Sequence, residues 1–261
     1  MTPTKEHIGE KISSVLRLSF SLAKVNFKLR NEGSYLGFLW YLLNPLALFF
    51  VLLFVKGQVF LQIDVPYYPI YLMIGLLMFH FSTSLLSASI GVISSSGNFI
   101  KSIKIPSEAL VISRVLQSVF SHFFELILIL ACLLYFNVSL YGLLVYLVVF
   151  ASLTIFLLGV SFVFATLGVY VNDLNNIWAV VSQVLFFITP IFHIPVVDSL
   201  LYKINLFNPL YYFMSLGREM FVYGRLPSLA LFAGVMLISF CSFFIGLYIF
   251  EKKKDRFAEL V

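Results

Sequence analysis

The chain has 261 residues, of which 61% are hydrophobic and 11% charged, with a net charge of +5 and a mean hydropathy of +1.01. Soluble domains carry about 25% charged residues, so this composition excludes a soluble globular protein and leaves little room for a domain outside a membrane. The positive charge fits the cytoplasmic loops of a membrane protein better than it fits nucleic-acid binding.

Residues 1–35 are predicted to form a cytoplasmic segment that lies on the membrane surface. An apolar stripe opposite charged residues predicts an amphipathic interfacial helix over 5–23. The stripe consists of Ile8, Ile12, Val15 and Leu16. The alternative is a solvated tail. Basic residues follow at Lys24, Lys28 and Arg30, directly before the first long apolar run.

Six apolar runs are each predicted to cross the membrane as a helix, because about 20 residues at 1.5 Å each span a hydrocarbon core of roughly 30 Å. The runs are 36–55, 70–93, 115–136, 141–171, 177–194 and 227–250. The fourth run is longer than a span needs, so it must tilt, kink or protrude, with Gly159 and Gly168 as adjustment points. The fifth is short and is expected to bend at Pro190, which lacks a backbone donor. The sequence therefore predicts an all-α membrane protein with a six-helix transmembrane domain over 36–250.

The loop charges predict which side each loop faces. The segments 1–35, 94–114, 172–176 and 251–261 hold 13 Lys and Arg residues, whereas the loops on the other side hold 4. By the positive-inside rule both termini are cytoplasmic, and 251–261 is a basic cytoplasmic tail. The outer segment 195–226 is too apolar for a free loop and too interrupted to span, which predicts short re-entrant or interfacial helices.

Glu125 is the one Lys, Arg, Asp or Glu residue within the six runs, and it is expected near the middle of the membrane. A charge there costs several kcal/mol, so a partner or a water-filled path is required. His122 lies three residues earlier and is expected on the same helix face. Two interpretations stay open: Glu125 fastens helices together, or it contacts a transported substrate.

Motifs for catalysis are absent from the sequence. It contains no Gly-x-x-x-x-Gly-Lys-Ser/Thr phosphate loop, no His-Glu-x-x-His and no Gly-x-Ser-x-Gly. The four histidines have no metal-ligand spacing. We therefore expect no enzymatic activity, no metal and no cofactor in this chain, and a partner must supply any energy.

The motifs that are present resemble the membrane subunits of ABC polysaccharide exporters, the permeases of O-antigen, capsule and wall teichoic acid. The opening matches as Lys28-x-Arg30-x-x-x-Ser34-x-Leu36-Gly37-x-x-Trp40-x-x-x-Asn44-Pro45. Further matches follow in order, namely Lys101-x-x-Lys104-Ile105-Pro106, Leu167-Gly168-Val169-Tyr170-Val171-Asn172-Asp173, Gln183-x-x-Phe186-Phe187-x-Thr189-Pro190-Ile191 and Asn208-Pro209-Leu210. The resemblance covers about residues 20–260. Asn172 departs from the family, which usually has Arg there, so any contact of that Arg is in doubt.

The resemblance implies the permease half of a type-2 ABC exporter in the bacterial cytoplasmic membrane. A homodimer of this subunit would work with two copies of a separate ATPase, which binds ATP and Mg²⁺, and would export a lipid-linked glycan along the dimer seam. One alternative is the same fold in an exporter of a drug or small lipid. Another is a carrier that uses no ATP, although such carriers show repeats or charges within their helices.

The resemblance also assigns roles to candidate residues. In the first cytoplasmic loop, coupling to the ATPase is expected from Lys101, Lys104, Ile105, Pro106 and Ser107; the alternative is an ordinary basic loop. Aromatic faces stack on the apolar face of a sugar ring, so the path is expected to include Trp40, Trp178, Phe186, Phe187, Tyr211 and Tyr212 beside Glu125, each with plain packing as its alternative. Contacts with lipid headgroups or a carrier pyrophosphate are expected from Lys24, Lys28, Arg30 and Arg218.

Overall fold

The computed structural model describes residues 5–32, 35–59, 65–97 and 105–260. All regular secondary structure in these ranges is helical, which confirms the all-α prediction. Short 3₁₀ turns connect or end the helices at η1 (Gly37–Leu39), η2 (Ser94–Ser96) and η3 (Lys254–Arg256).

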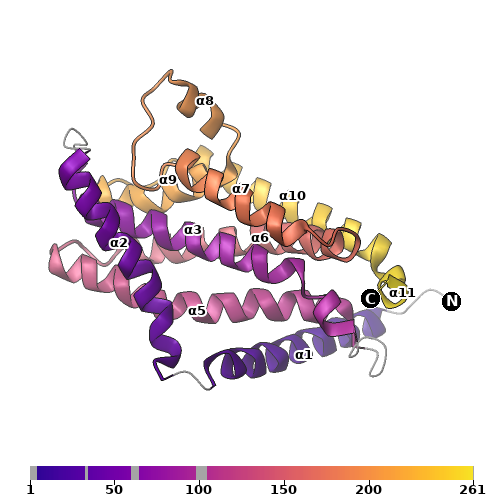
Figure 1. Ribbon diagram of the computed structural model, residues 1–261. Helices are drawn as coiled ribbons and strands as arrows, with labels where there is room; N and C mark the ends of the chain where they lie inside the picture. Colours follow the sequence, from indigo (N-terminus) through magenta and orange to yellow (C-terminus); the bar gives the residue numbers. More distant parts are fainter. Residues whose placement is uncertain (1–4, 33–34, 60–64, 98–104, 261) are drawn as a thin grey trace.

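Five helices within the described ranges are long and apolar enough to cross a membrane. They are α2 (Trp40–Val59), α3 (Tyr68–Ile90), α5 (Ser107–Tyr135), α6 (Gly142–Tyr170) and α10 (Leu229–Lys253). Figure 1 shows α3, α5, α6 and α10 running roughly along one direction, with α2 crossing them steeply. Most of α3 is buried, so this helix is the centre around which the others pack.

The fifth predicted run differs from expectation. It forms α7 (Leu174–Ile188), whose 15 residues reach only about 22 Å at 1.5 Å each. The helix stops because Pro190 disfavours a helical conformation at Thr189, which is extended with φ −69° and ψ 136°. The expected break at Pro190 is therefore confirmed, whereas a sixth helix of full spanning length is not found among the described residues.

The N-terminal helix α1 (Lys5–Asn31) is longer than predicted and runs through the basic residues. It packs along α5 through the small buried side chains of Ser19 and Ala23. Its apolar side chains Ile12, Leu16 and Phe20 are more than half exposed at a spacing of four residues. Among the described residues, only the edge-to-face contact of the Phe20 ring with Phe120 on α5, at 5.8 Å between centroids, is seen on this largely exposed stripe.

Two glycines in α6 lie at close contacts with neighbouring helices. The helix runs unbroken through Gly159 and Gly168. A Cβ at Gly159 would lie 2.2 Å from the carbonyl oxygen of Ser242 in α10, and a Cβ at Gly168 would meet the carbonyl of Ile90 in α3. These glycines allow close approach of neighbouring helices.

The predicted outer segment contains α8 (Leu200–Asn205) and α9 (Pro209–Val222). Asn208 begins α9 by accepting a hydrogen bond from the backbone N–H of Leu210 at 3.1 Å. Half of α9 is buried, and it packs against α3, α6 and α10. Short helices are thus present where they were expected.

A separate apolar cluster closes the opposite end of the bundle, around α11 (Phe257–Leu260). Phe257 is fully buried and its ring centroid lies 5.3 Å from that of Phe250. The cluster includes residues from both sides of the loop before α5, namely Val92, Ile93, Leu110 and Val111. The C-terminal segment therefore packs against residues that precede and residues that follow that loop.

Candidate functional site: a groove beside α7

Two adjoining hollows lie where α7 faces α2 and α3. One has a volume of about 180 Å³ and the other about 230 Å³. Phe79, Thr83 and Phe186 line both, so we treat the hollows as one feature and call it the α7 groove. The lining residues are Asn44, Pro45, Leu48, Leu76, Phe79, His80, Thr83, Ser182, Gln183, Phe186 and Phe187.

Aromatic rings form one wall of the α7 groove. The ring centroids of Phe79 and Phe186 are 5.5 Å apart, and those of Phe186 and Phe187 are 5.4 Å apart, both in edge-to-face arrangements. Such pairs hold each other's orientation. The Phe187 side chain is nevertheless 66% exposed. The structure thus brings together the two predicted residues Phe186 and Phe187, and presents their rings at the surface of the bundle.

Apolar and uncharged polar side chains line the rest of the groove. Asn44, Pro45 and Leu48 come from α2, and Ser182 and Gln183 from α7. Among the described residues the lining contains no Lys, Arg, Asp or Glu, so the groove offers a few amides, hydroxyls and one imidazole beside aromatic and aliphatic faces. This combination suits an uncharged, hydroxyl-rich molecule that stacks on rings and exchanges weak hydrogen bonds as it moves.

A buried hydrogen-bonded network connects the groove to the core. His80 is 41% exposed at the groove, and its Nδ1 lies 2.9 Å from Glu125 Oε1. The other carboxylate oxygen of Glu125 lies 2.8 Å from Nδ1 of His122, whose Nε2 is 2.9 Å from the hydroxyl of Tyr146. The network joins α3, α5 and α6, which agrees with the interpretation that Glu125 fastens helices. The pairing with His122 at i−3 is confirmed.

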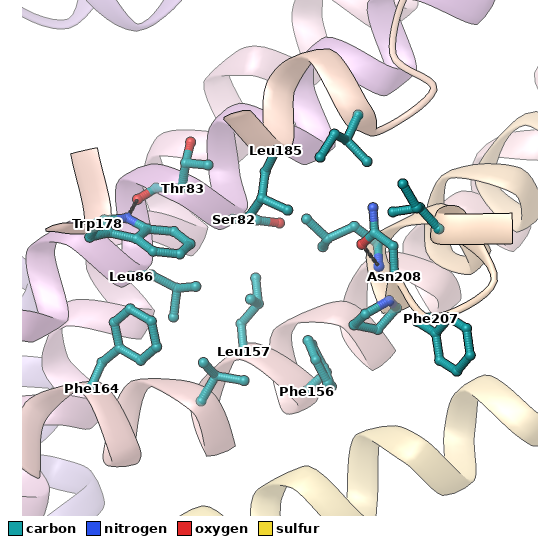
Figure 2. Close-up of a pocket in the computed structure, with 15 residues that line it drawn as sticks. Ser82, Thr83, Leu86, Phe156, Leu157, Phe164, Trp178, Leu185, Phe207 and Asn208 are labelled. Carbon is teal, nitrogen blue, oxygen red and sulfur yellow. Dashed lines mark hydrogen bonds between the residues drawn. The ribbon is translucent and has the colours of Figure 1, made fainter. Parts of the chain in front are cut away.

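The other predicted aromatic residues lie elsewhere. Trp178 is on another flank of α7 and lines a separate cavity, where its Nε1 donates to the carbonyl of Thr83 at 3.3 Å (Figure 2). Tyr211 and Tyr212 belong to α9, and the Tyr212 hydroxyl donates to the carbonyl of Leu206. Trp40 begins α2 one turn before Asn44 and is 49% exposed. Trp40 lies one turn before Asn44 and Trp178 one turn before Ser182, so these two residues adjoin the groove along their helices.

The predicted coupling residues are described only in part. Lys101 and Lys104 lie outside the described residues. Ile105 packs against the cluster around Phe257, and Pro106 directly precedes α5. Ser107, the first residue of α5, is buried. Ile105 is therefore the member of this set that packs against the cluster around the C-terminal segment.

The predicted basic contacts divide into exposed and buried groups. Lys24, Lys28 and Arg30 are all exposed on α1, and Lys28 lies 3.7 Å from Glu32. The Arg30 guanidinium lies 5.1 Å from the ring centroid of Tyr41. Lys24, Lys28 and Arg30 are thus free to meet an anion from outside the chain.

Arg218 is buried instead, with 3% of its surface exposed. Its guanidinium donates to the carbonyls of Tyr71, Pro190 and Ile191 at 3.0, 2.7 and 3.0 Å. It also lies 3.5 Å from the ring centroid of Tyr71. Every nitrogen of the side chain is engaged with the protein, so Arg218 ties the chain after α7 to α3 and presents no surface to an external pyrophosphate.

His80 is a groove residue that sequence reasoning missed, as it also missed Phe79, Thr83 and Ser182. It was one of four scattered histidines, and no spacing rule connects it with Glu125, which is 45 residues away. The signal that could have found it is physical. A buried carboxylate needs donors, and another ionisable group in a neighbouring apolar run can supply one.

Comparison with known proteins supplies the family. The profile of the ABC-2 type transporter family matches residues 17–222. The chain is 27% identical to an O-antigen export system permease protein RfbA of Klebsiella pneumoniae, covering 90% of this chain and 92% of that protein. A protein of the same name from Myxococcus xanthus is 26% identical, with 94% and 95% covered. The polysialic acid transport protein KpsM of Escherichia coli is 24% identical, with 84% and 87% covered.

Proposed function

The chain belongs to the ABC-2 type transporter family, and on that premise we propose that it is the permease subunit of an ATP-driven exporter of a lipid-linked polysaccharide. Relatives that match it over most of their length carry names of O-antigen and polysialic acid export. Since the sequence has no phosphate loop, a separate ATPase subunit hydrolyses ATP.

The observation that carries the proposal is the composition of the α7 groove. Sugar rings have apolar faces and a rim of hydroxyls, and the groove offers aromatic rings beside uncharged amides and hydroxyls. A polymer that must slide needs many weak contacts and no tight one, which is what a lining without Lys, Arg, Asp or Glu provides. Phe186 and Phe187 are the residues on which we expect the sugars to stack.

The path is completed by a second copy of the chain. None of the residues of α7 is buried within the chain, and Val180, Val184 and Phe187 are each more than half exposed. A C₂ dimer that places two α7 helices around a common axis would face both grooves toward one channel. Trp40 and the exposed cations Lys24, Lys28 and Arg30 would then lie where a lipid-linked anion enters.

The proposed topology has six crossings with both termini in the cytoplasm. In it α7 is the short crossing, and α8 and α9 complete the outer side as re-entrant helices. The stripe of Ile12, Leu16 and Phe20 on α1 would lie in the membrane surface. The segment 101–107 would contact the ATPase, in the bacterial cytoplasmic membrane.

Reconstitution of the transport reaction tests the function. The chain and its ATPase would be purified together and placed in vesicles that contain a lipid-linked glycan. We expect ATP to move the glycan across the bilayer, and an ATPase with a substituted phosphate-loop lysine to move none. Transport of a drug or small lipid with no movement of glycan would reject the proposal in favour of that alternative.

A further inference from the structure

A second cavity lies on another flank of α7 from the groove. Its volume is about 440 Å³. Figure 2 shows it between α7, α3 and α6, with Trp178 and Phe164 near one end and Asn208 and Phe207 near the other. We call it the back cavity. On α7 it is lined by Trp178, Leu185 and Ile188, whereas Ser182, Gln183, Phe186 and Phe187 line the groove.

The polar groups of α3 that line the back cavity are already bonded within the protein. The Ser82 hydroxyl donates to the carbonyl of Met78 at 2.7 Å, and the Thr83 hydroxyl donates to that of Phe79 at 3.0 Å. The carbonyl of Thr83 accepts the indole N–H of Trp178. These groups therefore offer no strong site for a water molecule.

Asn208, at the other end, is occupied in the same way. Its Nδ2 donates to the hydroxyl of Thr189 at 2.9 Å, and its Oδ1 accepts the backbone N–H of Leu210 at 3.1 Å. The remaining residues that line the cavity are aliphatic residues, aromatic residues and one proline. Because a buried water needs two to four polar partners, the back cavity excludes water and accepts apolar molecules.

The position of the cavity indicates which apolar molecules can reach it. Its walls include residues from the middle of α3 and α6, both candidate membrane spans, so in a membrane this part of the cavity would border the hydrocarbon core. α7 covers it without burying any of its own residues. On the flank of α7 away from the proposed dimer axis, lipid chains would border the cavity, and an unfilled volume would deprive its lining of dispersion contacts.

The size of the cavity matches one acyl chain. A dry cavity of 150 Å³ holds benzene, so by the same ratio a volume near 440 Å³ holds roughly eighteen carbons in a chain. We propose that the back cavity is a binding site for one acyl chain of a membrane phospholipid, which supports α7 from behind. A longer polyprenyl chain would leave much of its length outside. The inference does not depend on which substrate the groove carries.

Photolabelling of the full chain in nanodiscs tests the site. The probe is a phosphatidylcholine with a diazirine in mid-chain, and labelled residues are mapped by mass spectrometry. We expect labels on Leu86, Phe164 and Leu185. Val160→Phe fills the cavity from α6 and should remove them, whereas Val180→Phe, the same change on an exposed position of α7, should not.

Two results of this experiment would overturn the proposal. One is labelling that persists unchanged in a folded Val160→Phe protein. The other is labelling by a diazirine polyprenyl phosphate with none by the phospholipid, which would assign the cavity to a lipid carrier. Thermal unfolding of both variants establishes that they are folded.

A second measurement does not depend on filling the cavity. The chain has two tryptophans, so Trp40→Phe leaves Trp178 as the only one. In detergent, titration with a phospholipid brominated in mid-chain should quench Trp178 in a saturable step at one lipid per chain. Quenching that rises without saturation, or no quenching, would contradict a specific site.

Discussion

Glu125 shows at the scale of a single residue how an acidic group is kept inside an apolar bundle. It is 2% exposed, and its two carboxyl oxygens lie within hydrogen-bond distance of Nδ1 atoms of imidazoles on two helices. A buried charge is tolerated when it is paired and hydrogen-bonded, and its removal leaves the partners without an acceptor. The side chain is therefore a link between α3 and α5.

We predict that Glu125→Leu lowers stability by about 2–5 kcal/mol, because the Nδ1 atoms of both His80 and His122 lose their acceptor. Glu125→Gln keeps one acceptor oxygen and should lose less. The measurement is the unfolding temperature in detergent. A Glu125→Leu protein as stable as the natural chain would show that the network does not fasten the helices.

Phe187 carries the second prediction. Phe187→Ala should reduce export without changing stability, because the ring is 66% exposed and contributes little to packing. Phe244→Ala is the matched control, since this residue on α10 is 63% exposed and lies outside the groove. Surface polysaccharide is measured for each variant beside membrane protein level. Equal export by the two variants would remove Phe187 from the path.

The residue scale also shows where sequence reasoning stops. Glu125, Phe186 and Phe187 were identified because an acid in an apolar run and an ordered motif are visible in one dimension. Arg218 was expected to contact a headgroup or pyrophosphate because it lies in the predicted outer segment, whereas its side chain is buried. Its burial depends on the carbonyls of Pro190 and Ile191. These carbonyls have no helical hydrogen-bond partner because α7 ends before them, so they need other donors. No local pattern encodes that need.

At the scale of elements, α6 and α10 are in the closest contact. A Cβ on Gly246 would lie 2.0 Å from the carbonyl oxygen of Gly159, so the two backbones touch at this point. Small residues at membrane helix interfaces permit such approach.

We predict that Gly246→Ala separates α6 from α10 and destabilises the protein by about 1–3 kcal/mol through overpacking. Gly234→Ala on the same helix is the control, because nothing lies within 4 Å of the added carbon. It should be neutral or stabilise the helix by up to about 1 kcal/mol. Thermal unfolding distinguishes the two, and an equal effect of both would contradict close packing at Gly246.

The C-terminal segment is the second element with a testable role. Lys254 Nζ lies 2.5 Å from Glu108 Oε1 at the start of α5, and Phe257 is fully buried nearby. Phe257→Ala should release this segment, so that trypsin cleaves faster at Lys252 to Arg256. Leu260→Ala is the control, because Leu260 is half exposed. Unchanged cleavage after Phe257→Ala would show that the ring does not hold the segment.

Element boundaries were predictable to the extent that hydropathy sets them. Five of the six apolar runs form helices of spanning length, near the predicted positions. The shortening of α7 was foreseen at Pro190, although not its consequence for helix length. The contacts of the α6 glycines were not foreseen, because a glycine in a helix can mark a bend or a contact and the sequence of one helix does not show its neighbour.

At the scale of the whole molecule, the proposed topology depends on α7. If α7 and the chain after it cross the membrane, residues 189–228 are outside and the C-terminus is inside. If they do not cross, both assignments are reversed. Length alone leaves α7 short of the core, at about 22 Å.

We predict that Asp198→Cys is labelled from outside intact spheroplasts by a membrane-impermeant maleimide, whereas Glu259→Cys is labelled only after permeabilisation. Both residues are exposed, and Cys132 and Cys241 are first replaced by Ser. The opposite pattern would mean that α7 does not cross and would reject the six-crossing topology.

The Glu125 network has a consequence for how α5 inserts into a membrane. An acidic residue at a helix centre opposes insertion by about 3 kcal/mol. His80 lies in α3, which precedes α5 in the order of synthesis, and His122 lies within α5 itself. When α5 leaves the ribosome, both donors to Glu125 are therefore already made, and only Tyr146 in α6 is still to come. The order of the helices along the chain thus provides the acid with its partners before the bundle is complete.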